Sequence, residues 1–249
     1  MEASLIRDVR ALPDADGAAH AATRIFAEAS AEAVSLRNRF SVALSGGSTP
    51  HRLFHLLGSS HRGKLDWGHV QIFWADERCV PPDHEQSNFS VTHEALISRI
   101  DIPAENIHRI RGELRPEEAA AKYERDLRAY FGVTGIPRFD LILLGVGEDG
   151  HTASLFPGET AVSEMKRLAA QAFSSREGNW RVTLTLPVLN NAALVVFLVT
   201  GKEKARIIKT VLTEGKRNLY PAGLVRPHHG RVIWILDKDA ASGLKETEQ

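Results

Sequence analysis

Residues 139–151 read FDLILLGVGEDGH, a largely apolar run that gives way to three glycines and two acids. Runs of apolar residues are typical of strands in a parallel sheet, because such strands are buried on both faces. Glycines directly after a strand allow a tight turn. The stretch therefore predicts a buried parallel strand whose carboxyl end carries a polar loop.

Predicted helices and strands alternate along the rest of the chain. The helices are expected over 16–37, from near Pro50, over 116–131 and over 201–212, and residues 165–171 also look helical. Short apolar runs predict strands over 40–44, 70–74, 193–199 and 231–237, and the alternating run 181–187 predicts an edge or half-exposed strand. This order predicts a single α/β domain over 1–249, with a doubly wound, mostly parallel, Rossmann-like sheet and helices on both faces.

Composition narrows the class of protein. Among 249 residues, 31 bases balance 31 acids, which gives no support to a nucleic-acid binder. A single cysteine, Cys79, excludes an intramolecular disulfide and suits a reducing compartment. The longest apolar run, 192–199, is far shorter than the ~20 residues of a membrane span. We therefore expect a cytoplasmic protein that binds neither nucleic acid nor membrane.

Three polar, glycine-bearing or charged segments each follow a predicted strand. They are SGGSTP (45–50), ADERCVPP (75–82) and GVGEDGHTAS (145–154). The carboxyl ends of parallel strands meet at one edge of a sheet, where α/β proteins bind ligands. We expect the three segments to form one site.

The first segment suits an anion. Gly46 and Gly47 allow close approach of the backbone, and Ser48 or Thr49 can cap the helix that Pro50 opens. Free N–H groups at a helix start bind phosphate. Without Gly-Lys-Ser/Thr it is not a nucleotide P-loop, and a plain strand-to-helix turn remains an equal alternative.

The second segment is less specific. Asp76, Glu77 and Arg78 form either a solvated ion-pair cluster or a group that faces a cleft. Surface ion pairs are common, so the residues alone favour the solvated cluster.

The third segment allows two interpretations. Gly145, Gly147 and Gly150 fit the dinucleotide pattern G-x-G-x-x-G, but Glu148 and Asp149 would repel a pyrophosphate, and the expected acid ~20 residues later is missing. Asp149 and His151, one glycine apart, instead suit a carboxylate that holds a general base. The alternative is that His151 merely caps a helix starting at 152–153.

Other candidates carry less weight. His84, His93 and the pair 228–229 lack metal-ligand spacing, and Ser154 lies in no G-x-S-x-G elbow. Lys202 and Lys204 follow a strand, where cations oppose the helix dipole, so they face either an anion or solvent.

Taken together, SGGSTP, DERCVPPDHEQSNF, DLILLGVGEDGHTASLFPG, RVTLTLPVLNNA and VTGKEKA resemble the 6-phosphogluconolactonase family. The likeness runs in order from about Phe40 to 237. It implies one enlarged α/β domain that hydrolyses 6-phospho-D-glucono-1,5-lactone in the oxidative pentose phosphate pathway, with no cofactor, no metal and no obligatory protein partner.

Glucosamine-6-phosphate deaminases share this fold and are the main alternative. Their loop carries a glutamate where this chain has Phe156, and a tyrosine where it has Arg78, so both positions favour the lactonase. A sugar-phosphate sensor is a third alternative, although one domain of this length leaves no room for a fused module.

The resemblance also implies a role for each site residue. His151 matches the general base, Asp149 the residue that orients it, and Asp76 and Arg78 the pocket lining, with Arg78 stabilising anionic charge. Gly46, Gly47 and Ser48 match the phosphate turn, and Arg181 and Lys204 match cations near the 6-phosphate, with Lys202 left open as the second choice to Lys204.

Overall fold

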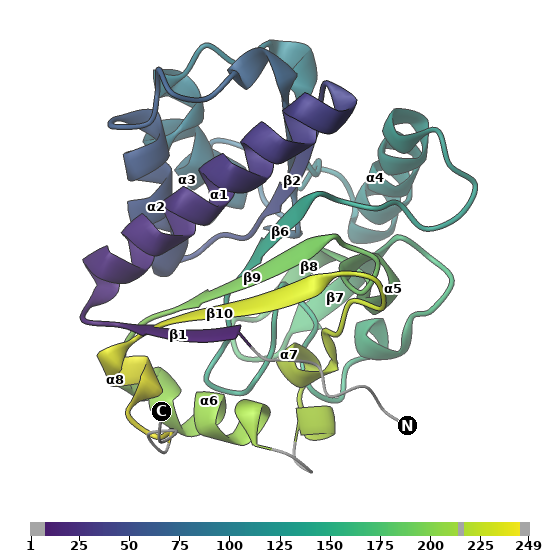
Figure 1. Ribbon diagram of the computed structural model, residues 1–249. Coiled ribbons are helices and arrows are strands. Elements are labelled where there is room, and N and C mark those ends of the chain that lie inside the picture. Colours follow the sequence, from purple (N-terminus) through teal and green to yellow (C-terminus); the bar gives the residue numbers. More distant parts are fainter. Residues whose placement is uncertain (1–7, 214–216, 245–249) are drawn as a thin grey trace.

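A computed structural model describes residues 8–213 and 217–244, apart from the side chains of Ser48 and Arg217 (Figure 1). Its centre is a seven-stranded sheet in the order β1-β10-β9-β6-β2-β3-β5, in which every neighbouring pair is parallel. The strands are β1 (Asp8–Leu12), β2 (Phe40–Leu44), β3 (Val70–Trp74), β5 (Ile107–His108), β6 (Leu141–Leu144), β9 (Leu194–Val199) and β10 (Arg231–Asp237). The predicted α/β class is confirmed.

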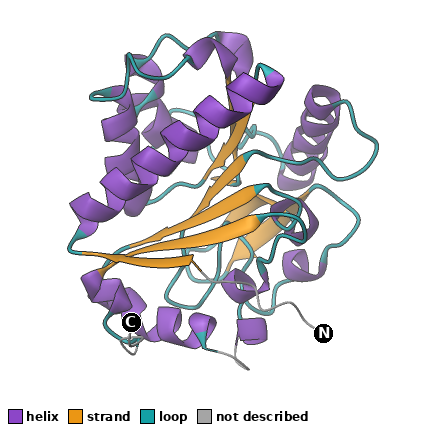
Figure 2. Ribbon diagram, in the orientation of Figure 1, coloured by secondary structure: helices purple, strands orange, loops and turns teal. Residues whose placement is uncertain are grey.

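Helices cover both faces of this sheet. Figures 1 and 2 show α1, α2 and α3 on one face and α6 and α8 on the other. The helices are α1 (Ala15–Arg37), α2 (Ser48–Gly58), α3 (Asn88–Ala95), α4 (Pro116–Phe131), α5 (Leu186–Leu189), α6 (Ala205–Leu212), α7 (Pro221–Leu224) and α8 (Lys238–Ala241). Shorter 3₁₀ turns span Trp67–His69, Ile97–Arg99, Ala104–Asn106, Thr160–Ser163, Lys202–Lys204 and Arg217–Leu219.

The core lies where β2, β6 and β9 are buried along their whole length. Neighbouring strands pack aromatic rings, as where Phe197 and Trp234 stack with centroids 3.9 Å apart. Within the described ranges no helix combines the length and apolarity needed to cross a bilayer.

A second, three-stranded antiparallel sheet was not predicted. It has the order β4-β8-β7, with β4 (Asp76–Arg78), β7 (Ala169–Ser174) and β8 (Asn179–Leu184). The helical prediction for 165–171 is therefore wrong, because pairing with β8 and packing on α4 outweigh the helix propensity of the Leu-Ala-Ala run. The edge-strand prediction for 181–187 is also wrong, since β8 is the central strand and is buried from Arg181 onward.

Strand order decides where the loops meet. From β2 the chain moves outward to β3 and β5, then returns to β6 on the other side of β2 and continues to β9 and β10. The order therefore reverses between β2 and β6, and in doubly wound sheets such a switch point opens a crevice at the carboxyl edge. The loops after β2 and β6 are SGGSTP and GVGEDGH.

Candidate active site

A cavity of about 470 Å³ lies at this carboxyl edge. Its wall is formed by residues from the loops after β2 and β6, from β4 and β8 of the small sheet, and from the connection between β9 and α6. Segments that are far apart in the sequence thus enclose one space of a size that suits a small ligand.

Most of the predicted site residues line this cavity. Those in its wall are Gly46, Gly47, Asp76, Arg78, His151, Arg181 and Lys204. Asp149 is held behind His151 by a hydrogen bond. Ser48 begins α2 next to Gly47, but its side chain lies outside the described part of the chain. Of the two lysines left open by the sequence, Lys204 contributes to the wall and Lys202 is exposed.

His151 and Asp149 form a close pair. The His151 Nδ1 atom lies 2.6 Å from Asp149 Oδ1, and the His151 backbone N–H donates to the same oxygen over 3.1 Å. Burial raises the pKa of Asp149, but the hydrogen bond and charge of His151 outweigh it and lower that pKa to about 2. The carboxylate is therefore ionised at neutral pH and favours the His151 tautomer with its proton on Nδ1.

Glycines make this pair possible. A Cβ at Gly147 would lie 2.1 Å from His151 Nδ1, so any larger residue would displace the imidazole. Gly150 has φ +82°, the left-handed region, and turns the chain between Asp149 and His151. No helix follows, since Thr152 and Leu155 form an isolated antiparallel bridge, so the helix-cap alternative for His151 is wrong.

The turn after β2 presents the start of α2 to the cavity. The helix begins at Ser48, with Gly47 as its N-cap, so the expected cap by Ser48 or Thr49 is wrong. Glycine has no side chain to occupy the first N–H groups, and those groups remain available to an anion. The Thr49 hydroxyl instead lies 3.3 Å from that of Thr200, the residue that directly follows β9.

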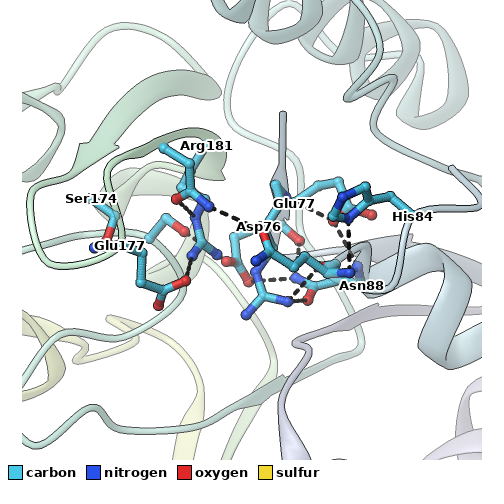
Figure 3. Close-up of polar contacts among 11 residues, drawn as sticks. Asp76, Glu77, His84, Asn88, Ser174, Glu177 and Arg181 are labelled. Carbon is cyan, nitrogen blue, oxygen red and sulfur yellow. Dashed lines mark hydrogen bonds and ion pairs between the residues drawn. The ribbon is translucent and has the colours of Figure 1, made fainter. Parts of the chain in front are cut away.

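Glu77 is the centre of a buried network that joins β4 to α3 (Figure 3). Its Oε1 accepts from the backbone N–H of Arg78 and of Asn88, each over 2.7 Å. Its Oε2 accepts from the Ser87 hydroxyl and the Phe89 N–H over 3.1 and 2.8 Å. Burial raises the pKa of Glu77, although these donors oppose the rise. The solvated-cluster interpretation of Asp76, Glu77 and Arg78 is therefore wrong.

Asn88 connects this network to the cavity. Its Nδ2 donates to the Asp76 carbonyl over 2.8 Å, and its Oδ1 accepts from Arg78 over 2.7 Å. A Cβ on Gly46 would lie 1.8 Å from Asn88 Oδ1, which accounts for glycine there. The Asp76 carboxylate, also buried, accepts from the Ser154 hydroxyl over 2.7 Å.

Two arginines face each other across the small sheet. Arg78 and Arg181 are register partners in the β4–β8 pair. Only 3% of the Arg181 side chain is exposed, and it donates to Asn179 Oδ1 over 3.0 Å and to Glu177 Oε2 over 2.5 Å. Burial, followed by the charge of Arg78, lowers the pKa of Arg181. This side of the cavity thus holds two guanidinium groups among the carboxylates of Asp76, Glu77 and Glu177.

Asn88, Ser154 and Glu177 line the cavity but were not predicted as site residues. Asn88 and Ser154 stand inside the quoted motifs, yet their side chains matter only through partners 10 to 78 positions away. Glu177 lies on a turn of the small sheet, which itself was not predicted. Sequence spacing carries no signal for such contacts.

No three residues of metal-ligand type cluster within 8–213 and 217–244. His84, His93, His228 and His229 therefore form no candidate metal centre in that part of the chain. The site is instead one of polar side chains, one histidine and converging cations.

Comparison with known proteins identifies the family. A model described as glucosamine-6-phosphate isomerases/6-phosphogluconolactonase matches residues 13–234. The chain belongs to this family. The description joins two activities, so membership in the isomerase/lactonase family does not by itself choose between them.

Curated relatives that match this chain at about 40% identity are named for one of the two. The 6-phosphogluconolactonase of Nostoc sp. is 39% identical over 216 residues, 85% of this chain and 88% of the relative. Human 6-phosphogluconolactonase is 42% identical over 208 residues, 82% and 81% of the two chains. The solved structure of 6-phosphogluconolactonase from Trypanosoma cruzi is 31% identical, with a TM-score of 0.89 over 98% of each chain. The family expected from the motifs is thus confirmed.

Proposed function

We propose that this protein hydrolyses 6-phospho-D-glucono-1,5-lactone to 6-phospho-D-gluconate in the oxidative pentose phosphate pathway. Relatives named 6-phosphogluconolactonase match it at about 40% identity over most of its length, which supports the reaction. Its cytoplasmic location and single-domain organisation stay predictions from the sequence.

One observation carries the choice of lactonase over deaminase. The ring of Phe156 packs on His151 with centroids 4.8 Å apart, inside the cavity wall. A deaminase-type loop places a glutamate at this position to exchange protons during ring opening. A phenyl ring cannot exchange a proton, whereas lactone hydrolysis needs no second acid there.

The proposed mechanism starts with the imidazole as base. With Nδ1 directed at Asp149, the Nε2 atom is the one that can take a proton from water. The resulting hydroxide attacks the lactone carbonyl carbon, and Asp149 stabilises the imidazolium that forms. A positioned base of this kind contributes ~100- to 10,000-fold. No covalent nucleophile, metal or cofactor is required, because a δ-lactone is already an activated ester.

Charge at the other end of the cavity holds the substrate. The free N–H groups of Gly47 and the α2 start, with Arg181 and Lys204, suit the dianionic 6-phosphate. Arg78 suits the negative charge that develops on the carbonyl oxygen, in the manner of an oxyanion donor. Binding energy from the remote phosphate then orients the reacting carbon toward His151. In the last step the imidazolium returns its proton to the ring oxygen, and the C1–O5 bond breaks.

The decisive test is to generate the lactone in situ and follow its loss against the spontaneous rate. Purified protein should accelerate the loss in proportion to its concentration, and the same preparation should release no ammonia from glucosamine 6-phosphate. Loss at the spontaneous rate would refute the lactonase, and ammonia release would favour the deaminase.

A further inference from the structure

In the structure the Arg181 guanidinium already forms an ion pair with a carboxylate of the protein. Glu177 reaches it from the turn 175–178 between β7 and β8, with its Oε2 atom 2.5 Å from the guanidinium (Figure 3). Both residues line the cavity. A carboxylate of the protein is thus paired with the same guanidinium group that, in the proposed function, binds the phosphate of the substrate.

The electrostatics explain why an anion is held there. Arg181 is almost fully buried, and Arg78 lies beside it in the β4–β8 register. The Arg78 Nε atom is itself buried and has no hydrogen-bond partner in the described structure. The buried carboxylates of Asp76 and Glu77 offset part of this positive charge from a distance, with no hydrogen bond to Arg181 among the described residues, and a buried guanidinium is further stabilised by a directly bonded anion. Among the described side chains, Glu177 supplies the one carboxylate bonded to Arg181.

This carboxylate is weakly held compared with the other acids of the site. Half of the Glu177 side chain is exposed, and Arg181 is its one ion-pair partner among the described residues. The turn is closed by the Gly178 N–H, which donates to the Ser174 carbonyl over 2.7 Å, and the Glu177 N–H donates to the Ser174 hydroxyl over 3.3 Å, so the weak holding concerns the Glu177 side chain and not the backbone. Glu77, by contrast, is buried and accepts four hydrogen bonds. Glu177 is the acid that can leave when another anion takes its place, since its own half-exposed side chain returns to water while the incoming anion compensates Arg181.

We propose that Glu177 is an intramolecular competitor of the substrate's phosphate for Arg181. Its carboxylate neutralises Arg181 in the free protein, gives way when a dianionic phosphate enters, and returns when the phosphate leaves. The proposal rests on the proposed function, because it takes the phosphate end of the ligand to lie at Arg181.

The competition has a consequence for turnover. Substrate and product carry the same 6-phosphate. Contacts to the phosphate alone would therefore bind both with equal affinity. A carboxylate that competes for Arg181 weakens both complexes and favours release of the product. Glu177 therefore sets phosphate affinity at the level that turnover requires.

The test measures binding of three probes by calorimetry: 6-phosphogluconate, inorganic phosphate and unphosphorylated gluconate. In Glu177→Gln the dissociation constants of the two phosphate probes should fall about 3- to 10-fold, because the competitor is removed. Gluconate binding should change less than about twofold. Glu177→Asp keeps the charge but shortens its reach, and should give a smaller gain in the same direction.

The matched control is Glu203→Gln. Glu203 also lines the cavity but bonds neither Arg78 nor Arg181 in the described structure, so its removal changes the charge of the cavity without freeing either arginine. Phosphate binding should change at most about twofold. An equal gain in Glu203→Gln would reduce the effect to overall charge and overturn the proposal. Weaker or unchanged phosphate binding in Glu177→Gln would instead make Glu177 a residue that positions Arg181, and would overturn it too.

The outcome is separable from that of the lactonase assay. A wild-type protein without lactonase activity, whose Glu177→Gln variant binds inorganic phosphate more tightly, would refute the reaction and keep the competition. An active wild type with unchanged affinity in the variant would refute the competition alone.

Discussion

The His151–Asp149 pair and the Glu77–Asn88 network border the same cavity but are built in opposite ways. The pair is partly exposed, at 30% and 44% of the two side chains, and depends on one short hydrogen bond and on glycines. The network is almost completely buried, and every oxygen of Glu77 has two donors. The exposed pair is suited to react with a ligand, while the buried network fixes the wall against which the ligand lies.

This difference predicts that activity and stability separate on mutation. His151→Ala should lower kcat about 100- to 10,000-fold, because the base is lost. The urea-unfolding midpoint should stay near that of the wild type, since the side chain is partly exposed, and 6-phosphogluconate should still bind. His228→Ala, at an exposed histidine outside the cavity, is the control and should keep full turnover. Near-normal kcat in His151→Ala would show that another group is the base.

Glu77→Gln should show the reverse pattern. The amide keeps one accepting oxygen and turns its NH₂ toward one of the two donor pairs, so up to two of the four hydrogen bonds are lost in a buried place. We expect the free energy of unfolding to fall by about 2 kcal/mol, measured by urea denaturation. Glu85→Gln, an exposed neighbour on the same connection, should change it by less than about 0.5 kcal/mol. Equal effects of the two variants would contradict the structural role of the buried network.

A third region, the connection after β9, tests whether cavity cations act on binding alone. Lys204→Ala should raise KM about tenfold with little change in kcat. The reason is that the contact of Lys204 with the phosphate is equally strong in the ground state and in the transition state. Lys202→Ala removes the same charge two residues away, on an exposed side chain that does not contribute to the wall, and should leave KM nearly unchanged. A larger effect at Lys202 would reverse the assignment.

The smallest expected effect concerns acid stability of the exposed pair. The pKa of Asp149 is about 2 in the folded protein, below its ordinary 3.8. The hydrogen bonds that its ionised carboxylate makes with His151 therefore stabilise the fold above about pH 4, and this contribution is lost as the pH falls from about 4 to about 2. Because Asp149 is nearly half exposed, the contribution is small. Urea curves of wild type and Asp149→Asn should differ at about pH 5 and converge toward about pH 2.5; a constant difference would contradict it.

The comparison also explains which parts of the protein the sequence revealed. Strands such as Phe40–Leu44, Val70–Trp74 and Arg231–Asp237 match their predicted ranges because the runs are apolar and local. The Asp149–His151 pair was visible because the two residues are one glycine apart. The small sheet was missed because β4 is only three residues long and β7 begins within a helix-favouring run, Leu168-Ala169-Ala170.

The sequence by itself determined the α/β class, the three loops at one sheet edge, and the pairing of Asp149 with His151, since each depends on residues close together in the chain. Only the tertiary structure decided the rest. Strand order put the switch point between β2 and β6. The residues Asp76, Glu77 and Arg78, expected as a surface cluster, instead form part of the cavity wall and its buried support. The β7–β8 turn brought Glu177 to Arg181. These outcomes depend on contacts between distant segments and on the removal of water from charged groups. The spacing of residues along the sequence indicates neither of them.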